Sequence, residues 1–343
     1  MRPGAPTAPR SVPWFRVCFT LSITVLAYAL VFGGTSLSGI RSEFQQLNPG
    51  WLITSVALVL VLQALRLLRW GVLLAAVAKV PTGVVARIGS IGTMAVDILP
   101  LRLGELVRPG LLHRLAGVPF ITGAATIVVE RLLDVLALLV ILGIAIGLTG
   151  LPVETASLGG WTIDLEVARG ALLLVVALLG LPLTGLVLAR SVTLRWAERV
   201  LGLLPNVASA PSLRWLNSFA DSVEKLGTPR PLLWSGLLSL MIWGVGVLVA
   251  WALMQASPQI QLGVLEAAVV TLFVAVALLM PAPAGGLGVF EAGAVVGVGL
   301  YGVTGAPAAL FAVTLHAVHL GTITLLGVVC LAWEGIPWRE VTR

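Results

Sequence analysis

Residues 100–110 read PLRLGELVRPG and place three charged side chains between two prolines in a strongly apolar chain. Only 10% of the 343 residues are charged, yet Arg102, Glu105 and Arg108 fall within seven positions. Proline lacks the backbone N–H that continues a helix, so a break is predicted at each of the two prolines. The stretch therefore predicts the broken tip of a helical hairpin that carries charge.

The composition requires a lipid environment. Hydrophobic residues make up 58% of the chain and the mean hydropathy is +1.05. Several apolar runs reach about 18 residues, long enough to cross about 30 Å of hydrocarbon. We therefore predict an all-α polytopic membrane protein. The net charge of +6 is spread over the ends of apolar segments, which is typical of membrane topology, so no nucleic-acid partner is expected.

Six apolar segments are long enough for full transmembrane helices, and two more are interrupted. The six are 15–33, 51–72, 120–148, 170–189, 232–254 and 306–331. The interrupted segments are 84–113, which contains Pro100 and Pro109, and 263–301, which contains MPAPAGGLG at residues 280–288. Their limbs are too short to cross a bilayer, so we expect two re-entrant hairpins whose non-helical backbone is buried in protein.

The basic residues predict the orientation in the membrane. Lys and Arg gather at the N-terminus, in the loop 190–231 and at the C-terminus, which places these parts in the cytoplasm. The loop 150–168 has acidic residues but no Lys or Arg, which places it outside. Part of the loop 190–231 is either a helix at the level of the lipid headgroups or an ordinary solvated loop, and the sequence does not choose between them.

The two halves of the chain share an order of elements. Residues from about 15 to 149 and from about 169 to 332 each contain two spans, a broken hairpin and a third span. A Gly-Val pair begins fourteen positions before Arg131 in one half and before His316 in the other. Three full spans separate the hairpins, so the copies are predicted to be inverted, as in transporters that hold substrate near the midplane.

Proline and glycine mark the predicted hairpin tips. Glycine permits tight turns and close helix contacts that other residues do not. The segment PAPAGGLGVFE lacks the GK[ST] of a nucleotide-binding loop and a preceding strand, which favours this membrane interpretation. The predicted hinge residues are Pro100, Gly104, Pro281, Gly285, Gly286 and Gly288.

Charged residues of the first half are candidates for holding an anionic headgroup. Arg66 and Arg69 lie three positions apart and share a helix face, where they either snorkel to the interface or bind a lipid phosphate. Arg102, Glu105 and Arg108 are also spaced by three. They form either a structural ion pair or a polar patch in which a headgroup pairs with the arginine that Glu105 leaves available.

Charged residues deep in the predicted spans form a second group of candidates. Glu130, Arg131 and Asp134 lie about 15 Å or more into their helix, where a charge costs about 2.5–3.5 kcal/mol unless it is paired. We expect a local pair of Arg131 with Asp134, and a pair of Glu130 with Arg102, Arg108 or another basic group. Glu291 and His316 are sparser, so His316 is interpreted first as a satisfied core histidine. A structural network and a substrate pathway both remain open.

Three motifs resemble one family over nearly the whole chain. The run that begins DILPLRLGELVRPG at residue 97, the segment PAPAGGLGVFEAGAVVGVGLYGV at 281–303 and RLLRW at 66–70 resemble the lysylphosphatidylglycerol synthase transmembrane, or flippase-like, family. The sequence departs at Leu101 and Ala282, where glycine is common, and at His316, where arginine is common. The resemblance implies a lipid-handling protein of the bacterial cytoplasmic membrane, related to the flippase half of enzymes that aminoacylate phosphatidylglycerol.

The resemblance and the charged residues together predict a lipid transporter. Its expected ligand is a phospholipid or a polyprenyl-phosphate lipid. The alternative is a membrane scaffold that recruits a lipid- or glycan-synthesising enzyme, and a homo-oligomer is a further possibility. The residues suggest no nucleophile elbow, metal site or cofactor, and no aminoacyl-transferring domain follows in the 343 residues, so we expect no enzymatic activity.

Overall fold

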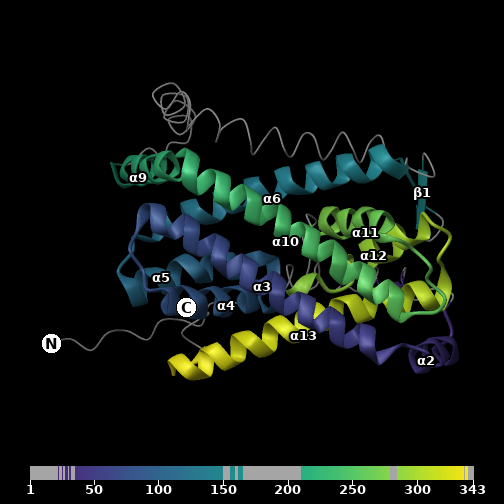
Figure 1. Cartoon of the computed structure of the whole chain (residues 1–343). Coiled ribbons are helices and arrows are strands. Elements are labelled where there is room, and N and C mark those ends of the chain that lie inside the picture. The colour runs from purple at the N-terminus through teal and green to yellow at the C-terminus, as the bar shows by residue number, and fades with distance from the viewer. Residues whose placement is uncertain are drawn as a thin grey trace.

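Four long helices frame the molecule in the computed structural model (Figure 1). It describes residues 35–149, 155–158, 161–164, 210–278, 284–335 and 337–338, together with five positions between 22 and 31. The predicted span 170–189 and most of the predicted span 15–33 lie outside the described residues. The four helices are α3 (Pro49–Val77), α6 (Phe120–Thr149), α10 (Pro229–Ala256) and α13 (Gly305–Glu334).

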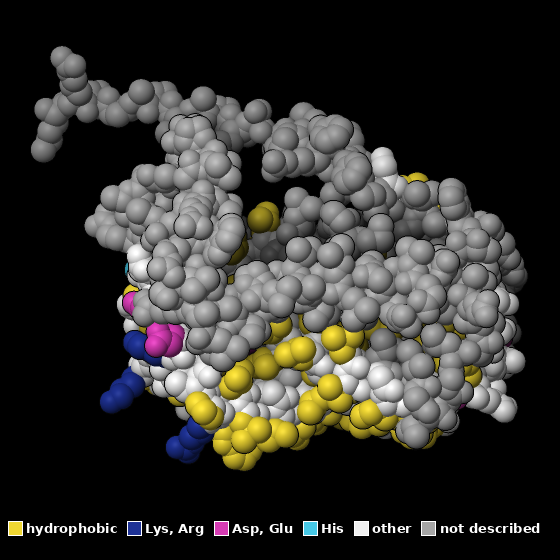
Figure 2. Space-filling model, turned by 90° about the horizontal axis from the view of Figure 1, so that it is seen from above, with side chains coloured by type: hydrophobic (Ala, Val, Ile, Leu, Met, Phe, Trp, Pro, Cys, Tyr) yellow, Lys and Arg dark blue, Asp and Glu magenta, His cyan; other side chains and the backbone are white. Residues whose placement is uncertain are grey.

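These helices lie at four of the predicted spans and are longer than predicted by one to seven residues. Helices α3, α10 and α13 are long and apolar enough to cross a membrane. Helix α6 has 30 residues, or about 45 Å, which also suffices, although charged residues interrupt its apolar sequence. Figure 2 shows apolar side chains along one flank and acidic and basic side chains at one end, as lipid and water require.

Both predicted hairpins are present, and each is broken at its tip. The first consists of α4 (Thr82–Ile98), the 3-10 helix η1 (Pro100–Leu106) and α5 (Val107–Ala116). The second consists of α11 (Val264–Ala277), the 3-10 helix η2 (Ala284–Gly286) and α12 (Val289–Gly299). The predicted break at Pro109 is wrong. Pro109 is the third residue of α5, and a helix leaves its first N–H groups without partners in any case.

Glycines shape the two tips for different reasons. A Cβ at Gly104 would lie 2.1 Å from the carbonyl carbon of Ala95, so only glycine lets η1 pack this closely on α4. Gly285, Gly286 and Gly288 have φ angles of 67°, 72° and 85°, which are costly for other residues. These glycines have the predicted hinge geometry, whereas Pro281 lies outside the described residues.

The two halves run in opposite directions. The backbone N–H of Asn48, just before α3, donates to the carbonyl of Ala256 at the end of α10 over 2.9 Å, so the start of one helix meets the end of the other. The first hairpin enters the bundle at the α9 end and the second at the β1 end, and η1 contacts η2 between them (Figure 1). This is the predicted inverted order, while the outer boundaries of the copies, near 15 and 169, remain predictions.

Four elements lie in segments predicted as loops. Helix α2 (Leu37–Gln45) precedes α3, and strands β1 (Thr155–Leu158) and β2 (Trp161–Asp164) form a short antiparallel ribbon. Helix α9 (Ala210–Leu226) lies in the basic loop and buries apolar side chains against α3 and α6. Part of that loop is therefore helical, and its position at the headgroups remains a prediction.

Candidate functional site

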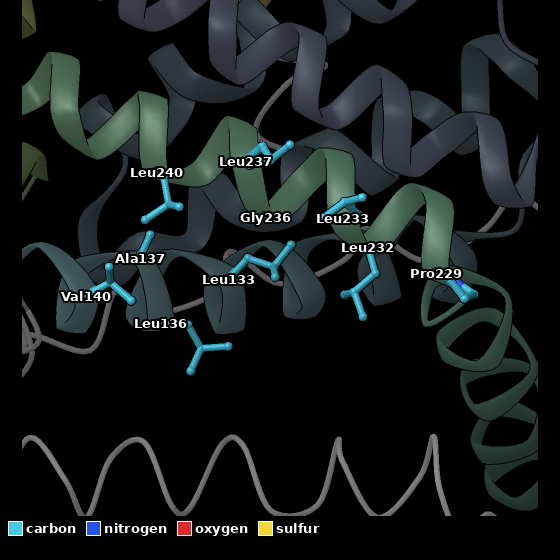
Figure 3. A pocket seen from close by; sticks show the side chains of 10 residues that line it. All are labelled: Leu133, Leu136, Ala137, Val140, Pro229, Leu232, Leu233, Gly236, Leu237 and Leu240. Carbon is cyan, nitrogen blue, oxygen red and sulfur yellow. The ribbon is translucent and has the colours of Figure 1, made fainter.

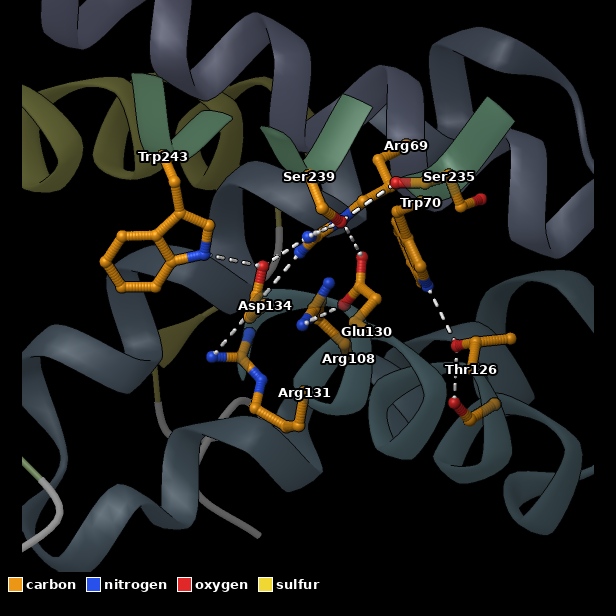
Figure 4. A network of polar contacts seen from close by, with 11 residues as sticks. Arg69, Trp70, Arg108, Thr126, Glu130, Arg131, Asp134, Ser235, Ser239 and Trp243 are labelled. Carbon is orange, nitrogen blue, oxygen red and sulfur yellow. Dashed lines mark hydrogen bonds and ion pairs between the residues drawn. The ribbon is translucent and has the colours of Figure 1, made fainter. Parts of the chain in front are cut away.

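Five charged residues form a buried cluster between α3, α5, α6 and α10, which we call the first polar centre (Figure 4). They come from elements far apart in the sequence and are brought together by the packing of the first hairpin between long helices. Four of the five are buried, and Arg131 is about half exposed, with 41% of its side chain accessible. The members are Arg69, Arg108, Glu130, Arg131 and Asp134.

Arg69 connects both carboxylates of the centre. Its Nε lies 3.5 Å from Glu130 Oε1, and its Nη1 donates to Asp134 Oδ1. The same Nη1 donates to Ser239 Oγ on α10 at 2.8 Å, and the indole of Trp243 donates to Asp134 at 3.3 Å. Of the two predicted alternatives for Arg69, snorkelling to the interface is excluded, because its side chain is 3% exposed and turns into the bundle.

Arg108, on the second limb of the first hairpin, belongs to the same cluster. Its Nη2 lies 2.8 Å from Glu130 Oε2, and its guanidinium lies over the ring of Trp70 at 5.4 Å from the centroid. A Cβ at Gly92 would lie 2.0 Å from Arg108 Cγ. Position 92 of α4 must therefore be glycine for the helix to pack against this side chain. Trp70 is fixed in turn by a 3.1 Å hydrogen bond to Thr126.

The sequence prediction for these charges is confirmed in two points. Arg131 Nη1 lies 3.5 Å from Asp134 Oδ2, which is the expected local pair, and Glu130 finds Arg108, one of its expected partners. Arg108 thus takes its carboxylate from α6, while Glu105 lies half-buried in η1. The side chain of Arg102 lies outside the described residues, so its predicted role is still open.

A second polar centre lies where the second hairpin meets α13. It consists of Tyr28, Glu291 and His316. The Glu291 carboxylate accepts hydrogen bonds from the Gly288 N–H at 2.8 Å and from the Tyr28 hydroxyl at 3.1 Å, and Glu291 Oε1 lies 2.8 Å from His316 Nδ1. The imidazole also stacks on Phe290, with centroids 4.3 Å apart. His316 is thus a satisfied buried histidine, as predicted.

Arg66 lies between the two centres. It interacts electrostatically with Asp97 at the end of α4 and with Asp134 and Arg131 of the first centre, and His319 of α13 interacts with both Arg66 and His316. Arg66 is half-buried, and it forms no hydrogen bond or ion pair with any residue that the structure describes. It differs in this from Arg69, Arg108 and Arg131.

The hairpin tips meet beside Arg66. A Cβ on Gly285, in η2, would lie 2.9 Å from the Asp97 carbonyl oxygen and 3.8 Å from His316 Nε2. The end of α4, the tip of the second hairpin and the imidazole of α13 are therefore neighbours. Elements of both halves thus converge on one polar junction.

An apolar groove runs along the other side of the α6–α10 pair (Figure 3). Its volume is about 470 Å³, and side chains of both helices line it. Leu133 of α6 belongs to the groove and its neighbour Asp134 to the first polar centre, so the same helix turn presents both surfaces.

Several contact residues were missed by the sequence analysis. Tyr28, Trp70, Ser239 and Trp243 all donate hydrogen bonds in or beside the centres. The only signal in the sequence is a polar or aromatic side chain inside an apolar run, which many membrane helices contain. Within the described residues, no group of three or more His, Cys, Asp or Glu side chains is placed to hold a metal ion.

Two inverted helix–hairpin–helix units with buried charges at their junction define a polytopic membrane protein built on an inverted repeat. Residues 17–327 match the family described as the lysylphosphatidylglycerol synthase TM region, and the chain belongs to this family. No curated protein matches the chain. The family expected from the three sequence motifs is thereby confirmed.

Proposed function

We propose that the protein binds a phosphate-bearing lipid at the junction of its hairpins and moves the headgroup across the cytoplasmic membrane. The observation that carries the proposal is Arg66, a guanidinium beside the hairpin tips without an ion-pair partner among the described residues. A guanidinium is always charged and matches the oxygens of a phosphate with two parallel N–H donors.

The charge balance of the site favours an anion. The first polar centre has three guanidinium groups and two carboxylates, and beside it Arg66 adds a positive charge and Asp97 a negative one, which leaves one positive charge in excess. The Nε–H groups of Arg108 and Arg131 are buried and have no hydrogen-bond acceptor among the described residues. An unbalanced charge in a membrane interior is costly, so a bound phosphate lowers the free energy of the site.

The groove between α6 and α10 suits the acyl part of the same ligand. It is lined by apolar side chains and lies beside helix turns that also contribute to the first polar centre. A lipid can then keep a tail in apolar surroundings while its headgroup enters the polar junction. Hairpins that enter from opposite ends offer the headgroup two alternative exits, one toward each leaflet.

A reconstituted flipping assay tests this function. Fluorescent phosphatidylglycerol and a polyprenyl phosphate are supplied in vesicles, and headgroup transfer is followed by quenching of the outer leaflet. We expect Arg66→Gln to reduce transfer by about tenfold or more, since the loss of one charge-assisted pair costs about 1.5–3 kcal/mol. Arg41→Gln, at an exposed arginine of α2, is the matched control and keeps the wild-type rate.

The same assay separates transport from its alternative. Undiminished transfer by folded Arg66→Gln protein would exclude Arg66 as the headgroup ligand. Lipid that binds without any transfer in the wild type would instead support a membrane scaffold for a lipid-synthesising enzyme. No catalytic step is part of the proposal.

A further inference from the structure

The second polar centre is built from groups that can gain or lose a proton. Glu291 Oε1 accepts from Tyr28 and faces His316 Nδ1, while Glu291 Oε2 accepts from the Gly288 N–H, so both carboxylate oxygens are occupied. Glu291 and His316 are 2% and 4% exposed. We propose that His316 is a proton-binding site and that lipid movement by this protein is coupled to protonation of its imidazole.

The surroundings of His316 allow its imidazole to bind a proton but not a lipid headgroup. One face of the ring is stacked on Phe290, and Nδ1 is engaged with Glu291, so a headgroup has no access to either. With Nδ1–H donating to the carboxylate, Nε2 holds the free electron pair, and a proton adds there without breaking another bond. Imidazole is the side chain that changes charge near neutral pH.

The charged groups around His316 link its proton to the lipid. Glu291 on α12 attracts a positive imidazole, Tyr28 binds the carboxylate, and His319 on α13 interacts with both His316 and Arg66 of α3. A phosphate on Arg66 offsets positive charge in this group of neighbours and so favours the proton. By reciprocity, protonated His316 favours the phosphate. This coupling rests on the function proposed above.

The proton-accepting atom, His316 Nε2, also lies at the contact between the two hairpins. His316 Nε2 and the Asp97 carbonyl oxygen lie 3.8 Å and 2.9 Å from the point where a Cβ of Gly285 would stand. A protonated Nε2 becomes a donor beside the tip of the second hairpin and the end of α4. Protonation thus changes a hydrogen-bonding group at the place where the inverted halves meet.

Two readouts test the coupling. In the first, phosphatidylglycerol transfer is measured in vesicles between about pH 5.5 and about pH 8.5. The wild-type rate is expected to change by about tenfold across this range, and the His316→Gln rate to be independent of pH. His113→Gln, at an exposed histidine of α5, is the control and keeps the wild-type profile.

In the second readout, short-chain phosphatidylglycerol is titrated into detergent-solubilised protein in two buffers of different ionisation enthalpy. Wild-type protein is expected to take up a fraction of a proton per bound lipid, and folded His316→Gln protein none. An unchanged pH profile together with unchanged proton uptake in His316→Gln overturns the proposal. Proton uptake without lipid transfer would leave the proton site standing and refute transport, so the two failures are distinguishable.

Discussion

The two polar centres pair corresponding elements of the inverted repeat, the second hairpin limb and the following long helix, with opposite charges. In the first half, Arg108 on the second limb of the hairpin meets Glu130 on the following long helix at 2.8 Å. In the second half, Glu291 on the second limb meets His316 on the following helix, also at 2.8 Å. The hairpin limb is thus basic in one half and acidic in the other.

The charged groups of the two centres differ in whether they can change their protonation. Arginine cannot lose its proton in a protein, so the first centre stays charged at every physiological pH. Histidine can be neutral or charged, so the second centre is adjustable. The first centre fixes α3, α5, α6 and α10 together, and the second contains the proposed proton site. Variants of matching residues in the two halves test this contrast.

The largest effect is expected for Glu130→Gln. The change leaves Arg69 and Arg108 buried with less compensating charge, and breaking such a pair costs about 3–5 kcal/mol. Thermal unfolding in detergent, followed by circular dichroism, should show a large loss of stability or no folded protein. Glu224→Gln, at an exposed position of α9, is the control. Wild-type stability of Glu130→Gln would show that the first centre is not a structural lock.

An intermediate effect is expected for Gly92→Ala. The added methyl group would meet Arg108 Cγ at 2.0 Å and push this side chain away from Glu130, an overpacking that costs about 1–3 kcal/mol. Gly110→Ala on α5 is the matched control, because a Cβ there meets no atom of the described residues within 4 Å. Equal unfolding temperatures for the two variants would contradict the tight passage of α4 beside Arg108.

A smaller effect is expected for Glu291→Gln, at about 1–2 kcal/mol, because neutral His316 can still donate to an amide oxygen. The loss relative to wild type should grow as the pH falls, since a protonated imidazole then lacks its carboxylate. Unfolding midpoints of both proteins across a pH series measure this. A loss as large as that of Glu130→Gln, and independent of pH, would remove the distinction between the centres.

The sequence predicts the elements of the fold better than the contacts of the site. Hydropathy locates the long helices, and prolines and glycines locate the hairpin tips, because both follow from local chemistry. Pro109 was misjudged since its position in the first helix turn depends on where η1 ends. The burial of Arg69 depends on which face of α3 meets α6 and α10, and that is decided by packing.

The sequence locates the matching positions of the repeat to within one residue, but not the residue that makes the contact. The spacing after the Gly-Val pairs matches Arg131 with His316, whereas the residue that faces the hairpin limb in the first half is its neighbour Glu130. Glu130 is the eleventh residue of α6 and His316 the twelfth of α13, and each helix has 30 residues. One position is about 100° around a helix, enough to exchange one contact for another.

Lipid retention shows whether an anionic headgroup binds Arg66 between the hairpins. Native mass spectrometry compares phosphatidylglycerol with uncharged diacylglycerol on wild-type, Arg66→Gln and Arg41→Gln protein. We predict that wild type and Arg41→Gln retain phosphatidylglycerol preferentially and that Arg66→Gln lowers this preference by about tenfold, equivalent to about 1.4 kcal/mol. Equal retention of both lipids by the wild type, or an unchanged preference in folded Arg66→Gln protein, would contradict the claim.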